Sequence, residues 1–536
     1  MNPIPAQLPI IDAVKLGKTF SVDAAPGGGK STILKMIDEI LKSPNFIALM
    51  FSNALAAELK EEFKFGKVST LHAHGLWACR EYLRVNNIRL QNAFKDGKVY
   101  KTAVHEETTE FAIFQYLKQT YGLVKEIPKH LHIQGEDVPF NIVVQTIKKV
   151  IESIALNALD YRNHDKIHSV YDIKFGNEFV GHGINVLTDI VEKFFLKRGQ
   201  VDFIGMLYSP VMLPEVQHHI IKPEILAIDE SQDSNPLMQE MYKLIASNAI
   251  QVILMGDKNQ TIHIWNHTSP IALEQLSNHF GAEIIEYSVS FRLPHVVTNY
   301  LNASGLDPNI TAWTDKQGSI QSISLTKAMM KEFRNGDWVL GRFNKVRTKS
   351  VVSLEKLSID LLSLGKDVRL LGSDYRDVCK RCMHKLDGKK GHPVVELDAI
   401  IKAEIKEIEK AKGPKHHKAR KLESDLEVFT LYYNFYSSKK SSLSLLQFLE
   451  TMYASGDNAI TLCTYHRSKG KEAERIFLMH TDIIYADIVN QDLPMPQRIE
   501  AKNLLYVGIT RTLHDLFVID GQLPDSFPTL NFVEEA

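Results

Sequence analysis

This 536-residue sequence has few cysteines, no long apolar run and almost no excess of charge of either sign. Its four cysteines, Cys79, Cys379, Cys382 and Cys463, are too few and too scattered for a disulfide framework, which favours a reducing compartment. No apolar stretch approaches the length that crosses a bilayer, and the N-terminus lacks the basic and apolar segments of a secretory signal. We therefore expect a cytoplasmic protein without a membrane segment.

The charges are balanced, with 63 basic and 64 acidic side chains and a formal net charge of −1. This balance argues against a protein that coats nucleic acid non-specifically, so any nucleic-acid binding must come from a local groove. The chain is longer than one hydrophobic core usually organises, and we expect two to four domains.

Short apolar strand patterns alternate with helical patterns near both ends of the chain. Strands are expected at 19–23, 46–51, 225–228, 252–255, 337–340, 460–463, 476–478 and 516–518, and helices at 32–37, 54–59 and 354–364. Such alternation predicts parallel α/β sheets, whereas 81–197 is mainly helical and carries no recognised motif. We predict a first α/β domain (1–80 and 198–290) with a helical insertion (81–197), and a second (291–374 and 446–536) with a smaller helical insertion (375–445).

A glycine-rich loop joins the first predicted strand to the first predicted helix. Glycine lets backbone N–H groups approach a phosphate closely, and the N-terminus of the following helix favours an anion. Lys30 is expected to reach the terminal phosphates of ATP, and the Ser31 hydroxyl to coordinate Mg²⁺. The structural alternative, a tight turn before a helix, is disfavoured by the flanking strand and helix. The predicted phosphate-binding residues are Ala25, Pro26, Gly27, Gly28, Gly29, Lys30, Ser31 and Thr32.

Two adjacent carboxylates follow a second apolar strand, in Ile225-Leu226-Ala227-Ile228-Asp229-Glu230. A phosphate-binding loop needs an acid at a neighbouring strand end. Asp229 is expected to hold the Mg²⁺ shell and Glu230 to orient and deprotonate the attacking water. An isolated Asp-Glu pair is weak evidence, but here it continues as Ser231-Gln232-Asp233.

The run Asp229–Asp233 resembles motif II of the UvrD/Rep/PcrA branch of superfamily 1 DNA helicases. Further segments resemble other motifs of that family and follow in the same order across nearly the whole chain. The resemblance implies two RecA-like P-loop domains of α/β class that close around one ATP, and movement 3′→5′ along single-stranded DNA. The matching segments are 51–53, 70–72, 202–203, 256–265, 290–292, 464–472 and 505–511.

The resemblance also assigns roles to the residues that match. Gln7 would select the adenine edge, Phe291 would stack on the adenine ring, and Glu472 would hold the ribose. Gln260 would sense the γ-phosphate, and Arg292 and Arg511 would act as arginine fingers, for which surface or interface salt bridges are the alternative. The residues implied to contact single-stranded DNA are Phe51, Asn53, Thr70, His72, Trp265, Thr464 and His466.

Aromatic rings stack on bases without regard to sequence, and Trp265 is the strongest candidate for this role. Tryptophan usually packs inside a protein, so burial in the core is the alternative for Trp265. For Phe51, at a strand end, the two interpretations weigh about equally.

The sequence departs from the family in two places. After Trp265 stands Asn266-His267-Thr268, where members of the family often have Arg-Gly-Ala, and this change removes a cation near the DNA. The region between the segments at 290–292 and 464–472 is also shorter than the accessory domain of full-size helicases, which puts duplex engagement by that domain in doubt.

Two smaller features have open interpretations. Cys379, Cys382, His384 and His392 have partly ligand-like spacing for zinc, although the helical surroundings disfavour a metal site. The basic run 412–421 fits a solvated turn between helices better than a contact with a DNA backbone.

We therefore expect a DNA helicase or single-stranded DNA translocase that uses ATP and Mg²⁺ and acts on single strands and their junctions with duplex. The first alternative is a DNA-dependent ATPase that remodels protein–DNA complexes without unwinding. The second is a nucleotide-sensing subunit of a nuclease or defence complex. A protein partner for loading, or a nuclease partner, is compatible with all three.

Overall fold

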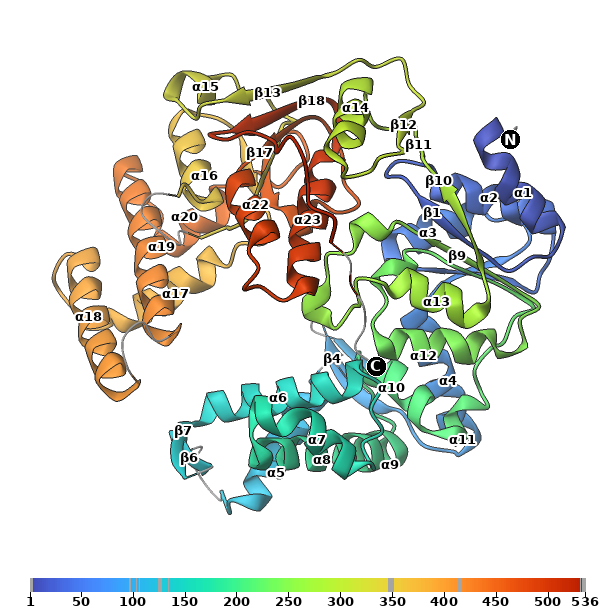
Figure 1. Ribbon diagram of the computed structural model, residues 1–536. Coiled ribbons are helices and arrows are strands. Elements are labelled where there is room, and N and C mark those ends of the chain that lie inside the picture. Colours follow the sequence, from blue (N-terminus) through green and yellow to red (C-terminus); the bar gives the residue numbers. More distant parts are fainter. Residues whose placement is uncertain are drawn as a thin grey trace. The chain divides into compact units, whose positions relative to one another are not determined.

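The computed structural model describes residues 3–95, 98–102, 104–105, 107–123, 128–133, 135–345, 351–412, 417–530 and 532. The chain divides into two compact units, Met1–Ser288 and Val289–Ala536. In Figure 1 the first unit runs from blue through teal to green, and the second from yellow-green to red. The domain boundaries that we predict from the sequence stay predictions.

The first unit is built on six parallel strands in the order β10-β1-β9-β8-β2-β3. Strands β2, β8 and β9 are buried along their whole length. Their nearly continuous apolar sequences fit a parallel sheet that is covered on both faces. The strands are β1 (Phe20–Ala24), β2 (Phe46–Met50), β3 (Lys67–Thr70), β8 (Ile225–Ile228), β9 (Gln251–Gly256) and β10 (Glu283–Tyr287).

Polar side chains cap several helices of this unit. Ser52 accepts a hydrogen bond from the backbone N–H of Leu55, and Asn235 accepts one from Met238, so these helices start where their sequences provide a cap. The helices around the sheet are α1 (Leu8–Lys15), α2 (Lys30–Leu41), α3 (Asn53–Glu62), α4 (Leu71–Val85), α10 (Gly205–Met212), α11 (Pro214–Gln217), α12 (Pro236–Ile245) and α13 (Ala272–Phe280).

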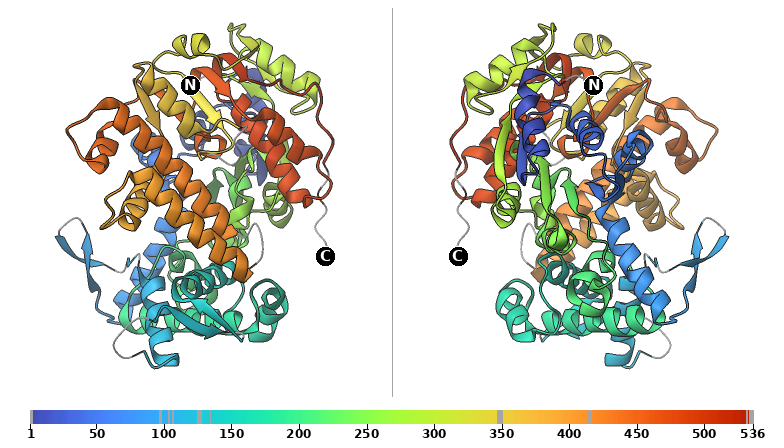
Figure 2. Two further views of the ribbon diagram at one scale, coloured as in Figure 1. Left: turned by 90° about the vertical axis from the view of Figure 1, so that its left-hand side faces the viewer. Right: turned by 90° about the vertical axis from the view of Figure 1, so that its right-hand side faces the viewer.

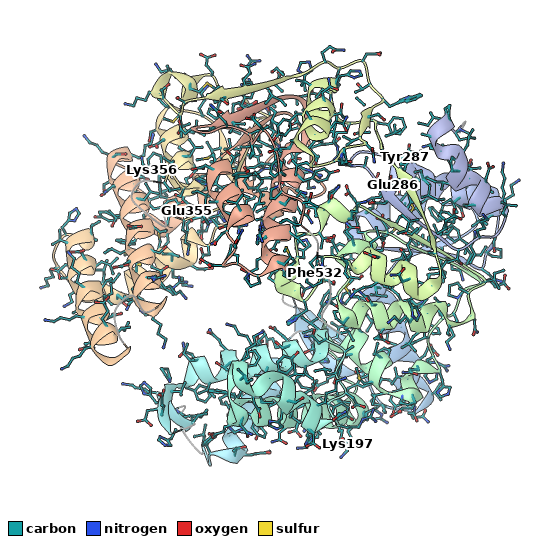
Figure 3. All side chains as sticks on the ribbon, viewed as in Figure 1. Lys197, Glu286, Tyr287, Glu355, Lys356 and Phe532 are labelled. Atoms are coloured by element: carbon teal, nitrogen blue, oxygen red, sulfur yellow. The ribbon has the colours of Figure 1, made fainter. Side chains whose placement is uncertain are left out.

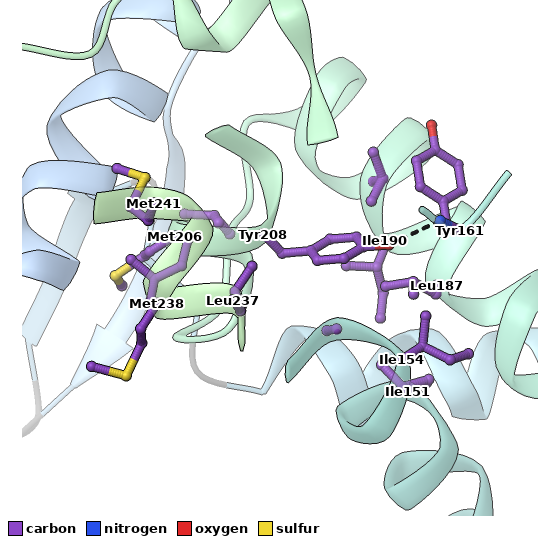
Figure 4. Close-up of a cluster of buried hydrophobic side chains, with 14 of the residues drawn as sticks. Ile151, Ile154, Tyr161, Leu187, Ile190, Met206, Tyr208, Leu237, Met238 and Met241 are labelled. Atoms are coloured by element: carbon purple, nitrogen blue, oxygen red, sulfur yellow. Dashed lines mark hydrogen bonds between the residues drawn. The ribbon is translucent and has the colours of Figure 1, made fainter. Parts of the chain in front are cut away.

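The described residues between α4 and α10 form a mainly helical insertion within the first unit (light blue to teal in Figure 1) and include two hairpins that the sequence did not predict. A continuous apolar core joins the insertion to the sheet domain. In Figure 4, Tyr208 of α10 extends toward the insertion, where its hydroxyl accepts a hydrogen bond of 3.0 Å from the backbone N–H of Tyr161. The elements are α5 (Thr108–Thr120), α6 (Phe140–Leu156), α7 (His164–Phe175), α8 (Asn177–Asp189), a π-helical turn (Ile190–Phe195), α9 (Leu196–Arg198), β4 (Gln91–Lys95) with β5 (Lys98–Thr102), and β6 (His130–Ile133) with β7 (Glu136–Pro139).

The second unit also contains six parallel strands, in the order β13-β18-β17-β14-β16-β15. These are β13 (Ser319–Ile323), β14 (Trp338–Gly341), β15 (Val368–Leu370), β16 (Ile460–Thr464), β17 (Ala473–Leu478) and β18 (Thr512–Ile519), and a separate short pair is β11 (Val289–Ser290) with β12 (Thr311–Ala312). The helices next to the sheet are α14 (His295–Ser304), α15 (Lys327–Lys331), α16 (Leu354–Ser363), α21 (Tyr465–Ser468), α22 (Thr481–Val489) and α23 (Met495–Ile509), whereas α20 (Leu445–Thr451) packs in the apolar core of the smaller insertion.

The smaller insertion consists of α17 (Tyr375–Lys385), α18 (Pro393–Lys412) and α19 (His417–Lys439), and α18 packs along α19 (Figure 2). Cys379 and Cys382 lie in its apolar core, while His384 is exposed and pairs with a neighbouring aspartate. Among the described residues, no group of three or more His, Cys, Asp or Glu side chains is placed to hold a metal ion. Residues 413–416 of the basic run 412–421 lie outside the described residues.

The strands and helices predicted from sequence periodicity are confirmed. For example, the strand expected at 225–228 is β8, and the helix expected at 354–364 is α16. The sequence did not predict β10, whose residues Glu283 and Ile284 are exposed at the edge of the sheet, because an edge strand need not be apolar throughout.

Candidate nucleotide site and nucleic-acid cleft

The glycine-rich loop lies between the end of β1 and the start of α2. Gly27 and Gly29 have φ angles of 72° and 76°, which favour glycine. The loop is tied to the sheet at its start, where the backbone N–H of Ala25 donates to the carbonyl of Tyr287 (labelled in Figure 3) over 2.8 Å. No side chain caps the N-terminus of α2. Its first backbone N–H groups are thus available to an anion in the loop.

Lys30 and the two acids after β8 form a compact charged cluster. The Lys30 Nζ atom lies 2.8 Å from Glu230 Oε1, and Asp229 is only 3% exposed. Burial lowers the pKa of Lys30, but the charges of Glu230 and Asp229 outweigh it, so the net pKa is raised and the ammonium group stays charged. Burial, and after it the charge of Glu230, raises the pKa of Asp229. The structure thus brings the predicted phosphate-binding lysine and both predicted acids together.

Asp229 offers an oxygen atom that suits a cation. Its Oδ1 atom is buried and has no hydrogen-bond partner among the residues that the structure describes. Leaving a buried carboxylate oxygen unpaired costs free energy, which a bound metal ion would offset. Ser31, on the first turn of α2, is partly exposed and provides a hydroxyl. Carboxylate and hydroxyl oxygens are suitable ligands for Mg²⁺.

Glu230 has a strained backbone, with φ at 50° in the left-handed region. Its carboxylate accepts a hydrogen bond from the side chain of Gln232, whose own Oε1 accepts one of 3.2 Å from the backbone N–H of Asp257. The Asp257 carboxylate in turn accepts a bond of 2.7 Å from Gln260 Nε2. Gln260, the predicted γ-phosphate sensor, is therefore connected by hydrogen bonds to the acid that is predicted to activate water.

Gln7 is buried at 3% exposure in a short turn, Pro5–Gln7. Its side-chain oxygen accepts a hydrogen bond of 3.0 Å from the backbone N–H of Ile4. This contact fixes the side-chain amide within the first unit, and its predicted role in adenine selection stays a prediction.

In the second unit, the predicted finger Arg292 and the predicted ribose ligand Glu472 are paired. Arg292 Nε donates to Glu472 Oε2 over 2.6 Å, and Arg292 Nη1 donates to the Thr510 carbonyl over 3.4 Å. The neighbouring Phe291 ring is 40% exposed, which leaves its surface accessible for stacking. The structure therefore places two predicted nucleotide contacts against each other.

The other predicted finger, Arg511, is only 2% exposed. Its Nε atom donates to the Val507 carbonyl at 2.9 Å, Nη1 to the Lys471 carbonyl at 3.4 Å, and Nη2 to Thr510 Oγ1 at 3.1 Å. A buried arginine held in this way stabilises the C-terminal end of α23 in this structure. Reaching a nucleotide would require it to exchange some of these bonds.

A cavity of about 750 Å³ opens in the first unit. Phe51, His72 and Trp265, three of the predicted DNA contacts, line it. Trp265 is 72% exposed and Phe51 is 45% exposed, so the core interpretation of these two residues is wrong. The walls are mainly apolar and aromatic, which is the surface that nucleobases need for stacking.

Phe203 is an aromatic residue of this cavity whose position the sequence did not reveal. It is 60% exposed, and its ring stacks on His72 with centroids 3.7 Å apart and an interplanar angle of 18°. Burial lowers the pKa of His72 to about 4, so the imidazole is neutral near pH 7. The segment Asp202-Phe203 had been matched to the family, but only the fold shows that its ring faces the same cavity.

The insertion also contributes to this cavity, although its sequence carries no recognised motif. Lys149 of α6, and Lys174 and Phe175 of α7, are lining residues. Asn157, just after α6, hydrogen-bonds to His267 with an Nδ2–Nδ1 distance of 3.0 Å. No periodicity or motif signalled these side chains, because only the packing of α6 and α7 brings them to the cavity.

Four predicted DNA contacts are not among the residues that line the cavity. Thr70 is buried, and its hydroxyl caps α4 by accepting a hydrogen bond of 3.3 Å from Ala73. Asn53 is exposed at the start of α3. In the second unit, Thr464 precedes α21, and His466 Nε2 lies 3.8 Å from a carboxylate oxygen of Glu500. Their roles in DNA binding stay predictions.

The fold and the loop define a P-loop protein with two parallel α/β sheets and a helical insertion in each unit. A model described as the UvrD/REP helicase N-terminal domain matches residues 6–281, and one described as the UvrD-like helicase C-terminal domain matches 389–522. The chain belongs to the UvrD/REP helicase family. This assignment confirms the predicted α/β class with two RecA-like domains.

Curated relatives are distant in sequence. The chain is 23% identical over 278 residues to the ATP-dependent DNA helicase Rep of Buchnera aphidicola, covering 48% of this chain and 36% of that protein. It is 23% identical over 323 residues to a probable DNA helicase II homolog of Rickettsia conorii, covering 55% and 44%. For the ATP-dependent DNA helicase PcrA of Staphylococcus aureus, the values are 21% over 253 residues, 45% and 31%. The chain thus spans less than half the length of these relatives. None of the helices in the described ranges is long and apolar enough to cross a membrane.

Proposed function

We propose that this chain is an ATP-dependent DNA helicase or translocase that moves 3′→5′ along single-stranded DNA. The observation that carries the proposal is that the first unit holds both a charged phosphate loop and an aromatic cavity. The residues that follow Glu230 are hydrogen-bonded to the residues on either side of Trp265. The Thr261 hydroxyl donates to the Gln232 carbonyl at 3.4 Å, and the Thr268 hydroxyl donates to the Asp233 carbonyl at 3.2 Å. Family membership supports the direction of movement.

In this proposal the loop from Ala25 to Thr32 cradles the phosphates of ATP, with Ser31 and Asp229 holding Mg²⁺. The metal ion would neutralise charge on the phosphates. Lys30, now paired with Glu230, would turn to the terminal phosphates, and the Glu230 carboxylate would then orient water and accept its proton.

The remaining nucleotide contacts come from outside the loop. Gln7 would recognise adenine, Phe291 would stack on its ring, and Glu472 would bind the ribose. Once Glu472 engages the ribose, Arg292 would be released to act on the phosphates, and Arg511 would join it. Gln260 would report the γ-phosphate through its bond to Asp257.

Single-stranded DNA would occupy the cavity lined by Phe51, His72, Phe203 and Trp265. Bases would stack on the rings, each contributing about 1–3 kcal/mol, without selecting a sequence. Lys149 and Lys174 would contact phosphates from the insertion side, which provides the local groove that a chain of balanced charge requires.

The test is steady-state ATP hydrolysis with and without single-stranded DNA, with Lys30→Ala as the control for contaminating ATPases. We expect strong stimulation by DNA and its complete loss in Lys30→Ala, because the phosphates lose their cation. Robust turnover that ignores DNA would reject the proposal. A forked duplex then separates the two modes: strand separation indicates a helicase, whereas displacement of bound protein without separation indicates a translocase that remodels complexes.

A further inference from the structure

The turn that carries Trp265 is anchored to the segment that follows the acidic pair Asp229 and Glu230. It is a short helical turn, Ile264–Asn266, closed by a hydrogen bond of 3.0 Å from the backbone N–H of His267 to the Ile264 carbonyl. Thr268, only 3% exposed, bonds to the carbonyl of Asp233 beside the acidic cluster. Trp265 itself is 72% exposed and makes a perpendicular ring contact with His263 at 5.9 Å.

A second anchor joins the same turn to the helical insertion. His267 ends the turn with φ at 61°, and its Nδ1 atom lies 3.0 Å from Asn157 Nδ2. The Asn157 Nδ2 atom also lies 2.8 Å from the Ser153 carbonyl oxygen and 2.9 Å from the Tyr171 hydroxyl, so its two hydrogens face three possible acceptors. The Tyr171 hydroxyl donates to the same Ser153 carbonyl at 2.8 Å. The anchor is therefore part of a hydrogen-bonded network that joins α6 to α7.

The chemistry of this bond sets the state of the imidazole. Where Asn157 Nδ2 donates one of its two hydrogens to this contact, His267 Nδ1 accepts it, and the ring proton of the neutral form lies on Nε2. Burial, and after it the charge of Lys174, lowers the pKa of His267, which agrees with a neutral ring. A protonated ring would carry hydrogen on both nitrogens and lose this bond.

We propose that His267 and Asn157 are positioning residues that hold the Trp265 platform against the insertion, so that both walls of the DNA cavity keep a fixed separation. The inference rests on the proposed function, because it concerns how the same cavity holds single-stranded DNA. His267 lines the cavity together with Trp265, Lys149, Lys174 and Phe175, and its contact with Asn157 ties the turn to the insertion. Without the bond, the turn loses this link to the insertion and is held less firmly against it.

The test compares Asn157→Ala, His267→Ala and the double variant by fluorescence-anisotropy titration with a labelled oligothymidine, and by the DNA concentration that half-maximally stimulates ATP hydrolysis. Each single variant should weaken DNA binding about tenfold, as expected for one lost hydrogen bond at a positioned site. DNA-independent turnover and the KM for ATP should stay unchanged. The double variant should bind DNA no more weakly than either single variant, since both substitutions remove the same bond.

His267→Asn is the rescue variant. Asparagine tolerates the left-handed backbone and offers an acceptor oxygen near the position of Nδ1, so binding should recover toward the unsubstituted level. Asn185→Ala, an exposed asparagine in the same insertion, is the matched control and should leave binding unchanged. Tyr171→Phe removes a network bond without removing His267 or Asn157, and thermal unfolding of all variants identifies losses that come from an unstable insertion.

Two results would overturn the inference: binding by both single variants equal to that of the unsubstituted protein, or losses in the double variant that simply add. A third contrary result is a loss of DNA affinity in Tyr171→Phe and Asn157→Ala that is proportional to the loss of thermal stability in each variant. If the unsubstituted protein itself fails to bind oligothymidine, the proposed function fails instead, so the two failures are distinguishable.

Discussion

The two units each contain six parallel strands, but their buried acids are organised differently. In the first unit, Asp229 and Glu230 follow β8 and stand beside Lys30 at the phosphate loop. In the second unit, the buried acid Glu355 lies on α16 beside the exposed Lys356 (Figure 3) and accepts a hydrogen bond from Ser373. Burial raises the pKa of Glu355 to about 7, so both units carry acids with raised pKa values.

The difference lies in the surroundings of each acid. Asp229 and Glu230 lie next to a cation, an uncapped helix N-terminus and glycines, all of which suit a phosphate and its metal ion. Glu355 lies close to the smaller insertion, where the buried rings of Tyr375 and Tyr432 stack at 4.8 Å. A raised pKa marks a functional site only where the neighbouring groups can also bind a ligand.

The arginines of the second unit reinforce this contrast. Arg511 and Arg292 have hydrogen-bonding partners within their own unit, from backbone carbonyls and from Glu472. Asp229 thus offers an oxygen atom beside the phosphate loop, whereas Arg292 and Arg511 must give up existing bonds before they can act.

Among the variants that test this comparison, Glu230→Gln should have the largest effect, which is on ATP hydrolysis. ATP should still bind, because Lys30 and the loop remain, but hydrolysis should fall by about 10²–10⁴-fold since the general base is lost. Single-turnover hydrolysis and binding of a fluorescent ATP analogue measure the two steps. Glu224→Gln, an exposed acid just before β8, is the control. If Glu230→Gln hydrolyses ATP at the rate of the unsubstituted protein, the general base is another residue.

Glu355→Gln should instead change stability and leave the chemistry of ATP unaffected. The pKa of Glu355 is raised from 4.5 to about 7 in the folded protein, so the folded state binds its proton more tightly than the unfolded state. The cost of ionising the buried acid is absent below pH 4.5, grows as the pH rises, and is complete above about pH 7, at about 3 kcal/mol.

Denaturant unfolding at pH 5 and pH 8 tests this expectation. Relative to the unsubstituted protein, Glu355→Gln should gain stability mainly at pH 8. Glu474→Gln, whose carboxylate is exposed, should show no such dependence. An equal change at both pH values would mean that Glu355 is not the group that titrates.

Trp265→Ala should give the smallest effect, a loss of about 1–3 kcal/mol in binding of single-stranded DNA, because one stacking platform is removed. Thermal stability should hardly change, since the side chain is 72% exposed. Trp313→Ala, which removes a ring that is 51% exposed in the second unit, is the matched control. A large loss of thermal stability in Trp265→Ala, or equal DNA affinity in both variants, would contradict the assignment of the cavity.

Much of the fold followed from local patterns. The strand before the phosphate loop, the buried strand that ends at Asp229 and the alternation with helices were all visible as periodicity. The hairpins of the insertion were missed because short, polar strands have weak patterns. The exposure of Trp265 could not be predicted either, since whether a tryptophan is buried depends on what packs above it.

The amino-acid sequence by itself determined the chemistry of the phosphate loop, because Lys30, Ser31, Asp229 and Glu230 stand in short motifs whose function depends on local geometry. Only the tertiary structure decided what surrounds the aromatic cavity. The match of segment 202–203 to the family does not show that Phe203 lines the cavity of Trp265, and Asn157, which contacts His267, comes from a segment without a recognised motif; packing brings both there from distant parts of the chain. Contacts between distant segments depend on how whole helices pack, and no local sequence pattern contains that information.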